Sequence, residues 1–299
     1  MEGSTATTTN ASRAGLRRAG LPLPLPRSLG TGIGRGLVVL YLSVMVLLPL
    51  AALTNESFSR GLRFFWDTVS SGQALRSLEL TLVCSLIVVL LNAFFGTIVA
   101  WLLVRDDFRG KAAINAIIDL PFALPTIVAS LILIELWGDQ SPVHVHIALT
   151  RLAIVVALLF VTLPFVVRSV QPLLIEMDTR MEEAAASLGA SGFTIFRRII
   201  FPNLLPGLAS GVALAFARAL GEYGSVLLFA GGLPATQVSS VFIRQQIESG
   251  NEPGAAAVSV VLLLCSLACL VIVSLIQRWG SRQERVRPGV GGEAGPQHA

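Results

Sequence analysis

The chain has 299 residues and a formal net charge of +4, and it is 54% apolar but only 13% charged. Soluble globular proteins carry about 25% charged residues, so this composition excludes a water-soluble surface of ordinary polarity and favours a bundle of membrane-spanning helices. The single lysine, Lys111, is followed by alanine and does not fit a phosphate-binding P-loop. We therefore expect no enzyme activity, no metal or other cofactor and no nucleic-acid partner for this chain, and any ATP would be used by a separate subunit.

Apolar runs long enough to cross lipid as helices occur six times along the chain. They lie near residues 37–53, 79–104, 114–137, 147–170, 207–232 and 255–276. The first run follows a mostly polar stretch and precedes no small-residue cleavage site, so we interpret it as an uncleaved span rather than a signal peptide. The sequence thus predicts an all-α, polytopic bundle of six transmembrane helices in contact with the lipid bilayer.

Two tails flank this bundle. Residues 1–35 and 279–299 are rich in polar residues, glycine and proline, which predicts disordered segments on either side of a six-span domain over residues 36–278. When the N-terminus is placed in the cytoplasm, sixteen of the 22 basic residues fall on the inner side and five on the outer side. This bias predicts a multi-pass protein of the cytoplasmic membrane with both termini in the cytoplasm.

The longest internal loop, residues 171–206, is predicted to form two short helices joined at a glycine. Thr179 and Glu182 fit a capping box at the start of the first helix. Gly189 suits the left-handed position after its end, and Ser191 can cap the second helix. The loop is therefore expected to be an ordered helix–turn–helix element outside the membrane.

The second of these helices is apolar along one face and is followed by prolines. Phe193, Phe196 and Ile200 recur at helical spacing and need a surface to bury against. The pattern leaves open whether that surface is the chain's own helix ends or a partner. Pro202 and Pro206 are expected to keep this helix from running smoothly into the next span.

The same loop carries a motif of fixed spacing. It consists of Glu183-Ala184-Ala185, then Gly189 and, after nine residues, Ile199-x-Phe201-Pro202. This motif resembles the EAA loop of ABC importer permeases, with Phe201 in place of the usual leucine. The resemblance implies the type I permease fold, a core permease region over about residues 74–276, and a coupling helix seated in an ATP-hydrolysing subunit. The residues that it assigns to this coupling are Glu182, Glu183, Ala184, Ala185, Gly189, Phe193, Phe196, Ile199 and Pro202.

Further segments resemble the sulfate/thiosulfate branch of that family, and its T-type permease in particular, over about residues 37–278. They are Leu47–Leu53, Asp119–Thr126, Leu163–Pro172 and Phe216–Gly224. The resemblance implies import of sulfate or thiosulfate together with two copies of an ATP-binding subunit, a second permease that is a paralogue or another copy, and an extracytoplasmic sulfate-binding protein. The outer loop from Gly138 to Arg151 is shorter than is usual there. Import of molybdate or tungstate stays open as an alternative, and so does an ion-coupled secondary transporter.

The fifth predicted span carries Arg218 and Glu222 at helical spacing. Ionisable groups at membrane depth normally face the bundle interior or a water-filled path. The pair also shares its face with small residues that let helices approach closely, namely Gly207, Gly211, Ala215 and Ala219. Two interpretations stay open, a pair that lines the anion pathway and a structural ion pair that fixes helix register. Asp119, beside Pro121, is a further candidate for the pathway.

Overall fold

The computed structural model describes residues 27–285. No β-strand occurs among them and most are helical, which confirms the all-α prediction. The predicted tails fall in part outside this range, since residues 1–26 and 286–299 are not described. Residues 27–35 and 279–285, which the sequence assigned to the tails, are helical.

The chain divides into two units, one ending at Ala51 and one beginning at Ala52. The first contains α1 (Arg27–Leu42), the π-helical turn η1 (Ser43–Leu47) and the start of α2 (Leu48–Ser57). The stretch Gly34–Ser57 is apolar and long enough to cross a membrane. It agrees with the first predicted span.

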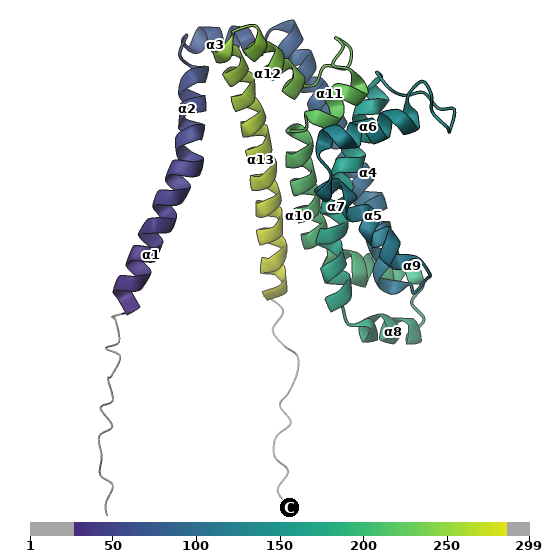
Figure 1. The fold of residues 1–299 in the computed structure, drawn as a ribbon. Helices are drawn as coiled ribbons and strands as arrows, with labels where there is room; N and C mark the ends of the chain where they lie inside the picture. Colours follow the sequence, from purple (N-terminus) through teal and green to yellow (C-terminus); the bar gives the residue numbers. More distant parts are fainter. Residues whose placement is uncertain (1–26, 286–299) are drawn as a thin grey trace, which may run out of the picture. The chain divides into compact units, whose positions relative to one another are not determined.

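The second unit contains the remaining helices (Figure 1). In chain order they are α3 (Leu62–Val69), α4 (Gly72–Arg105), α5 (Lys111–Ala123), α6 (Thr126–Trp137), α7 (Arg151–Glu176), α8 (Thr179–Ser187), α9 (Gly192–Ile195), the π-helical turn η2 (Phe196–Ile200), α10 (Phe201–Leu220), α11 (Gly224–Ala230), α12 (Ser239–Glu248) and α13 (Glu252–Arg285). Long apolar stretches in this unit that can cross a membrane are Gly72–Arg105, Arg151–Glu176, Gly192–Leu220 and Glu252–Leu275.

The third predicted span, residues 114–137, is not one helix. It is divided into α5 and α6, each too short to cross a membrane alone. Leu124, which separates them, has an extended backbone with φ −89° and ψ 135°. The residue before a proline is pushed out of the helical region by the proline ring, so Pro125 explains the break. Within residues 27–285 the uninterrupted long spans therefore number five rather than six.

The fifth predicted span, residues 207–232, is also wrong in its bounds. The helix begins before residue 207, runs through η2 without interruption, and ends at Leu220, and α11 follows only after a break at residues 221–223. Pro202 and Pro206 were expected to keep the helix from running smoothly into this span, and the helix is in fact continuous but departs from α geometry in the π turn η2 before Pro202. Pro202 lies in the first turn of α10, where a missing N–H is tolerated, and the wider π turn directly precedes it.

Helix α7 is the central helix of the second unit. Of its most apolar stretch 56% is buried, whereas the corresponding shares for α4, α10 and α13 lie between 22% and 33%. It packs against α4 on one side and α10 on another, and a buried hydrogen bond of 2.8 Å joins Asn92 of α4 to Thr162 of α7. The other long helices therefore keep larger apolar faces exposed.

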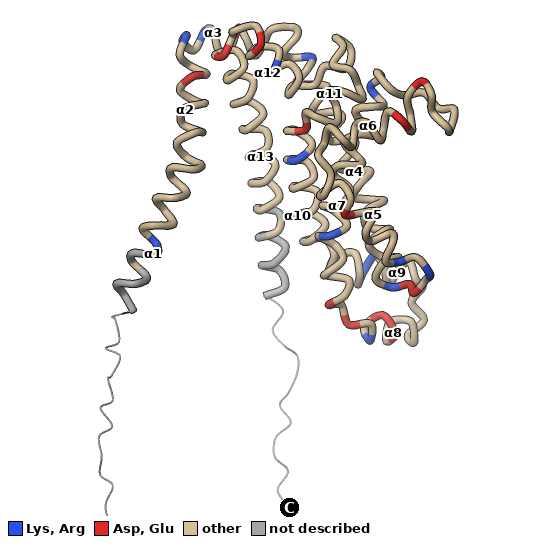
Figure 2. Tube along the Cα trace, viewed as in Figure 1, with Lys and Arg blue, Asp and Glu red and all other residues tan. Residues whose placement is uncertain are grey.

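The second unit has two distinct ends. Helices α8 and α9 lie at one end, and α3 and α12 lie at the other (Figure 1). We call these the α8 end and the α12 end. Charged residues gather mainly at these ends, and the long helices between them carry few (Figure 2).

Candidate functional site

The element at the α8 end is a helix, a glycine turn and a second helix, as predicted from the sequence. The N-cap of the first helix is Asp178, one residue before the expected Thr179. The Asp178 side chain accepts a hydrogen bond from the Arg180 N–H at 2.9 Å. Gly189 has φ +83°, a left-handed conformation that other residues rarely adopt. Ser191 caps α9 by accepting from the Thr194 N–H at 3.3 Å.

Two large apolar side chains stand unburied on this element. Leu188 is 89% exposed and Phe193 is 73% exposed, and they flank the Gly189 turn. Ile200, by contrast, is buried in the core, and Phe196 contacts the rings of Trp101 and Phe201. The predicted apolar face is therefore shared: its C-terminal part packs on this chain's own helices, while its tip is left uncovered.

The remaining residues of the motif are mostly at the surface. Glu183 and Ala184 are exposed on α8, and Pro202 is exposed in the first turn of α10. Ala185 and Ile199 are half-buried. None of these side chains is fully buried in the core, so one face of the α8–α9 element is free to contact a partner.

Glu182 differs from its neighbours because it is tied to the membrane domain. Its carboxylate forms an ion pair with Arg105, the last residue of α4, and both side chains are about four-fifths buried. The Arg105 guanidinium also lies over the Trp101 ring, 5.5 Å from its centroid. The pair therefore fastens α8 to the end of α4, a link that sequence analysis missed because the two residues are 77 positions apart.

A second charged site occupies the break between α10 and α11. Arg218, in the last turn of α10, forms an ion pair with Glu222, which lies outside the helix. The predicted pair thus exists, but not on the face of one continuous helix as expected. The Glu222 side chain is 1% exposed and that of Arg218 is 33% exposed.

Glu222 is held by α11 as well as by arginine. Its Oε1 atom accepts hydrogen bonds from the Ser225 N–H at 2.9 Å and from the Ser225 hydroxyl at 2.8 Å. A carboxylate at this position satisfies free N–H groups in the first turn of α11. The Ser240 hydroxyl of α12 donates to the Glu222 carbonyl oxygen at 2.6 Å. The break is therefore an ordered junction of α10, α11 and α12.

Arg244 extends this junction on the side of α12. Its guanidinium donates to the Tyr223 hydroxyl at 2.7 Å and to Glu248 at 2.6 Å. The hydrogen bond that Arg244 donates to Glu248 raises the pKa of Arg244, and the charge of Glu248 adds to the effect. The arginine is thus cationic at every physiological pH.

A third charged site joins α5 to α7. Arg168 donates two hydrogen bonds to the Asp119 carboxylate, at 2.8 Å and 2.6 Å, in the bidentate geometry that arginine favours. The same guanidinium donates to Asn115 at 3.1 Å and to Gln171 at 2.5 Å. Asp119 is half exposed and Arg168 one-third exposed, so the pair borders the surface of this chain.

The small residues of α10 lie against α7. A methyl group added to Gly207 would come within 2.6 Å of the Ser169 carbonyl oxygen, and one added to Gly211 would come within 3.0 Å of the Val166 Cα. Ala215 and Ala219 are fully buried. The two helices are therefore in direct backbone contact.

Sequence analysis missed two partners in these sites. The sequence analysis named Asp119 without its partner Arg168, although the two are opposite charges in two neighbouring predicted spans. Such a pair could have been inferred, because ionisable residues in spans seek each other. The break at residues 221–223 could have been suspected from Gly221 and Gly224 on either side of Glu222, but nothing in the sequence indicated that Ser225 holds the carboxylate.

Comparison with known families gives these features a context. The family described as "Binding-protein-dependent transport system inner membrane component" matches residues 92–285. The chain belongs to this family. It is accordingly a multi-pass membrane protein and the membrane subunit of an ABC importer.

Curated relatives are more specific. The permease is 42% identical over 252 residues to the "Sulfate transport system permease protein CysT" of Synechocystis sp., which covers 82% of this chain and 88% of that one. It is 37% identical over 256 residues to the protein of the same name from Salmonella typhimurium, with 83% and 92% covered. The relatives and this permease therefore align along nearly their whole lengths.

Solved structures agree on the fold. A chain of a bacterial alginate ABC transporter in complex with an alginate pentasaccharide-bound periplasmic protein has a TM-score of 0.71 at 16% identity, covering 88% of this chain and 97% of that one. A chain of the MetNI methionine ABC transporter in an inward-facing conformation has a TM-score of 0.55 at 23% identity, covering 69% and 95%. The permease thus has the fold of ABC importer membrane subunits.

Proposed function

We propose that this permease is the membrane-spanning subunit of an ABC importer that carries sulfate or thiosulfate into the cytoplasm, with its α8 end and both termini on the cytoplasmic side. The observation that carries the proposal is the identity to sulfate transport system permeases over four-fifths of the chain. The partners are two copies of an ATP-binding subunit, a second permease, and an extracytoplasmic sulfate-binding protein. The family match favours this assignment over an ion-coupled transporter that acts alone.

The α8–α9 element is the proposed contact with the ATP-binding subunit. Leu188 and Phe193 project from it, and burial of two such side chains against a partner contributes about 1.5–3 kcal/mol each. Glu182 keeps the element attached to α4 while the partner moves. Displacement of the element by ATP-driven closure of the partner would then move α4, and with it the bundle.

The two arginine–carboxylate pairs are proposed to lie along the anion pathway. A lone arginine in a dehydrated path would hold a divalent anion too tightly for release, whereas an arginine already paired with Glu222 or Asp119 offers weaker, exchangeable attraction. Because Arg218 and Arg168 are each one-third exposed, their guanidinium groups remain reachable. If substitution of either pair leaves sulfate uptake unchanged, that pair has a structural role and does not belong to the pathway.

Reconstitution tests the function as a whole. Liposomes that contain the permease pair, the ATP-binding subunit and the sulfate-loaded binding protein are expected to accumulate labelled sulfate only with internal ATP. Unlabelled thiosulfate should compete, and molybdate should compete poorly. Accumulation by the permease without the ATP-binding subunit would refute the proposal, and preferential uptake of molybdate would correct the substrate.

Coupling is tested by two matched variants. Phe193→Ala is expected to lower both the recovery of the ATP-binding subunit on purified permease and the uptake rate, because it removes the most exposed aromatic ring of the α8–α9 element. Leu62→Ala, which truncates a similarly exposed side chain at the α12 end, is the control and should leave recovery unchanged. Equal recovery in both variants would contradict the proposed contact.

A further inference from the structure

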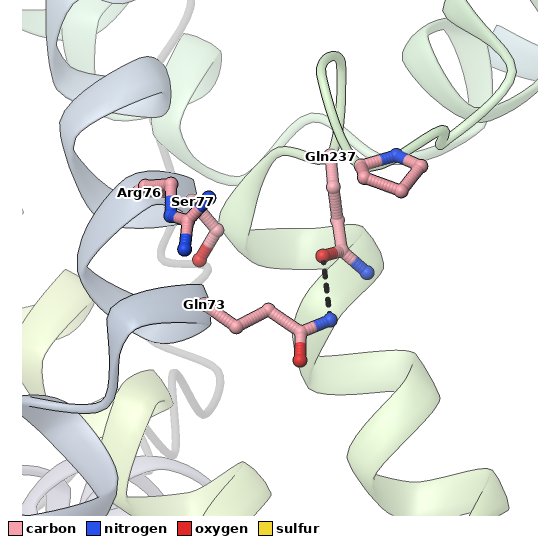
Figure 3. A pocket seen from close by; sticks show the side chains of 5 residues that line it. Gln73, Arg76, Ser77 and Gln237 are labelled. Carbon is pink, nitrogen blue, oxygen red and sulfur yellow. Dashed lines mark hydrogen bonds between the residues drawn. The ribbon is translucent and has the colours of Figure 1, made fainter.

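A polar pocket lies at the α12 end, apart from the charged pairs described above. Its volume is about 330 Å³, and it is open to one side. The lining residues come from the first two turns of α4 and from the segment that precedes α12: Gln73, Arg76, Ser77, Pro234 and Gln237. Figure 3 shows Arg76 and Ser77 on α4 opposite Gln237, with Gln73 reaching across to it.

The wall of the pocket is fixed by a small network of amides. Gln73 donates to the side-chain oxygen of Gln237 at 3.0 Å, and Gln237 donates to that of Gln245 on α12 at 2.7 Å. Gln237 is buried, with 8% of its surface exposed. The network therefore holds the α4 and α12 sides of the pocket at a set spacing.

The electrostatic character of the pocket is positive. No carboxylate lines it, and among the described residues 27–285 none of the ion pairs includes Arg76. The Arg76 Nε donates to the Gly72 carbonyl oxygen at 2.8 Å, which anchors the side chain while its terminal nitrogens stay unpaired. The N-terminus of α4, the positive end of a 34-residue helix, lies beside it.

Size and chemistry together point to one class of ligand. A water molecule takes ~30 Å³ of liquid volume, so the pocket holds an oxyanion together with several waters. The amide nitrogens of Gln73 and Gln237 already donate within the network, so the Arg76 guanidinium, with its free N–H donors, is the group that suits a tetrahedral oxyanion. Because Arg76 is exposed and the amides are neutral, such a site binds weakly and releases readily.

We propose that this pocket is an acceptance site for a tetrahedral dianion of the sulfate class, occupied on the extracytoplasmic side before the anion reaches the Arg218–Glu222 junction. The proposal rests on the proposed function and adds a site to it. Helix α12 connects the two places: its Gln245 accepts a hydrogen bond from the lining residue Gln237, and its Ser240 and Arg244 contact the junction. The anion thus meets an unpaired arginine first and a neutralised one afterwards.

Hydrogen exchange in the assembled transporter tests the pocket directly. Deuterium uptake at residues 72–77 is expected to slow when sodium chloride is replaced by sodium sulfate at equal ionic strength, and this slowing should be lost in Arg76→Gln. Arg63→Gln is the matched control, since Arg63 is an exposed arginine on α3 at the same end. Unchanged exchange in sulfate for the unsubstituted transporter would overturn the proposal whether or not the transporter carries sulfate.

Uptake at saturating binding protein gives the second readout. Arg76→Gln is expected to lower the maximal sulfate uptake rate about tenfold, which corresponds to ~1.4 kcal/mol, and Arg76→Lys should recover much of it. The affinity of the transporter for the loaded binding protein should stay the same. A loss that disappears at saturating binding protein would identify Arg76 as a protein-docking contact and overturn the proposal, and so would equal rates for Arg76→Gln and Arg63→Gln.

Discussion

Replacement of Gly207 by alanine tests the backbone contact between α7 and α10. The added Cβ would lie 2.4 Å from Leu173 Cδ1 and 2.6 Å from the Ser169 carbonyl oxygen. The leucine tip can rotate away, but the carbonyl belongs to the helix backbone, so α7 and α10 must separate. Overpacking of this kind costs ~1–3 kcal/mol, and the better helix propensity of alanine returns up to ~1 kcal/mol.

The expected net destabilisation for Gly207→Ala is therefore about 1–2 kcal/mol, or roughly 2–3 °C in melting temperature for a chain of this size. Gly211→Ala should have a smaller effect because its closest contacts are at 3.0 Å. Gly221→Ala is the control, since no atom lies within 4 Å of the added carbon. The assay is the fraction of detergent-purified transporter that survives heating. Equal melting temperatures for all three variants would refute the reasoning.

The charged pairs and the glycine turn give three further tests. Glu222→Gln is expected to lower the melting temperature because it leaves Arg218 without its counter-ion at a cost of about 3 kcal/mol, and adding Arg218→Gln should restore part of the loss; a double variant worse than both single variants combined would contradict the coupling. Asp119→Asn should change stability by less than about 1 kcal/mol, since the pair with Arg168 is partly exposed, while sulfate uptake falls; unchanged uptake would assign this pair a structural role. Gly189→Ala forces a side chain into the left-handed region at ~1–2 kcal/mol and should weaken recovery of the ATP-binding subunit on purified permease, with Gly192→Ala, a helical position with open space, as the control.

The long helices can be predicted from the sequence because the thickness of the bilayer sets their length and its apolar interior sets their composition. A span must be about 20 residues long and apolar, and a window of residues is enough to detect it. The same rule hides interruptions inside apolar runs. Residues 221–223 and the joint before Pro125 both lie in such runs, so two predicted spans are broken where hydropathy gives no signal.

The candidate site is predictable to the extent that it is local. The Gly189 turn and the Ser191 cap follow from residues within a few positions of each other. The partner of Glu182 does not, because it lies on another helix and depends on how the bundle packs, whereas the pair of Asp119 with Arg168 follows only from the general rule that charges within spans pair. The pocket around Arg76 joins segments more than 150 residues apart, and no spacing rule could have found it.

The attachment of α8 to Arg105 has a mechanical consequence. Helix α4 is an unbroken rod of 34 residues, about 50 Å long at 1.5 Å per residue, and its far end forms one wall of the polar pocket. Because α4 has no break along its length, a tilt of the helix at its Arg105 end is expected to displace Gln73 and Arg76 at the other end relative to α12. On the proposed function, anion occupancy of the pocket and the nucleotide state of the ATP-binding subunit would therefore be coupled through this one helix.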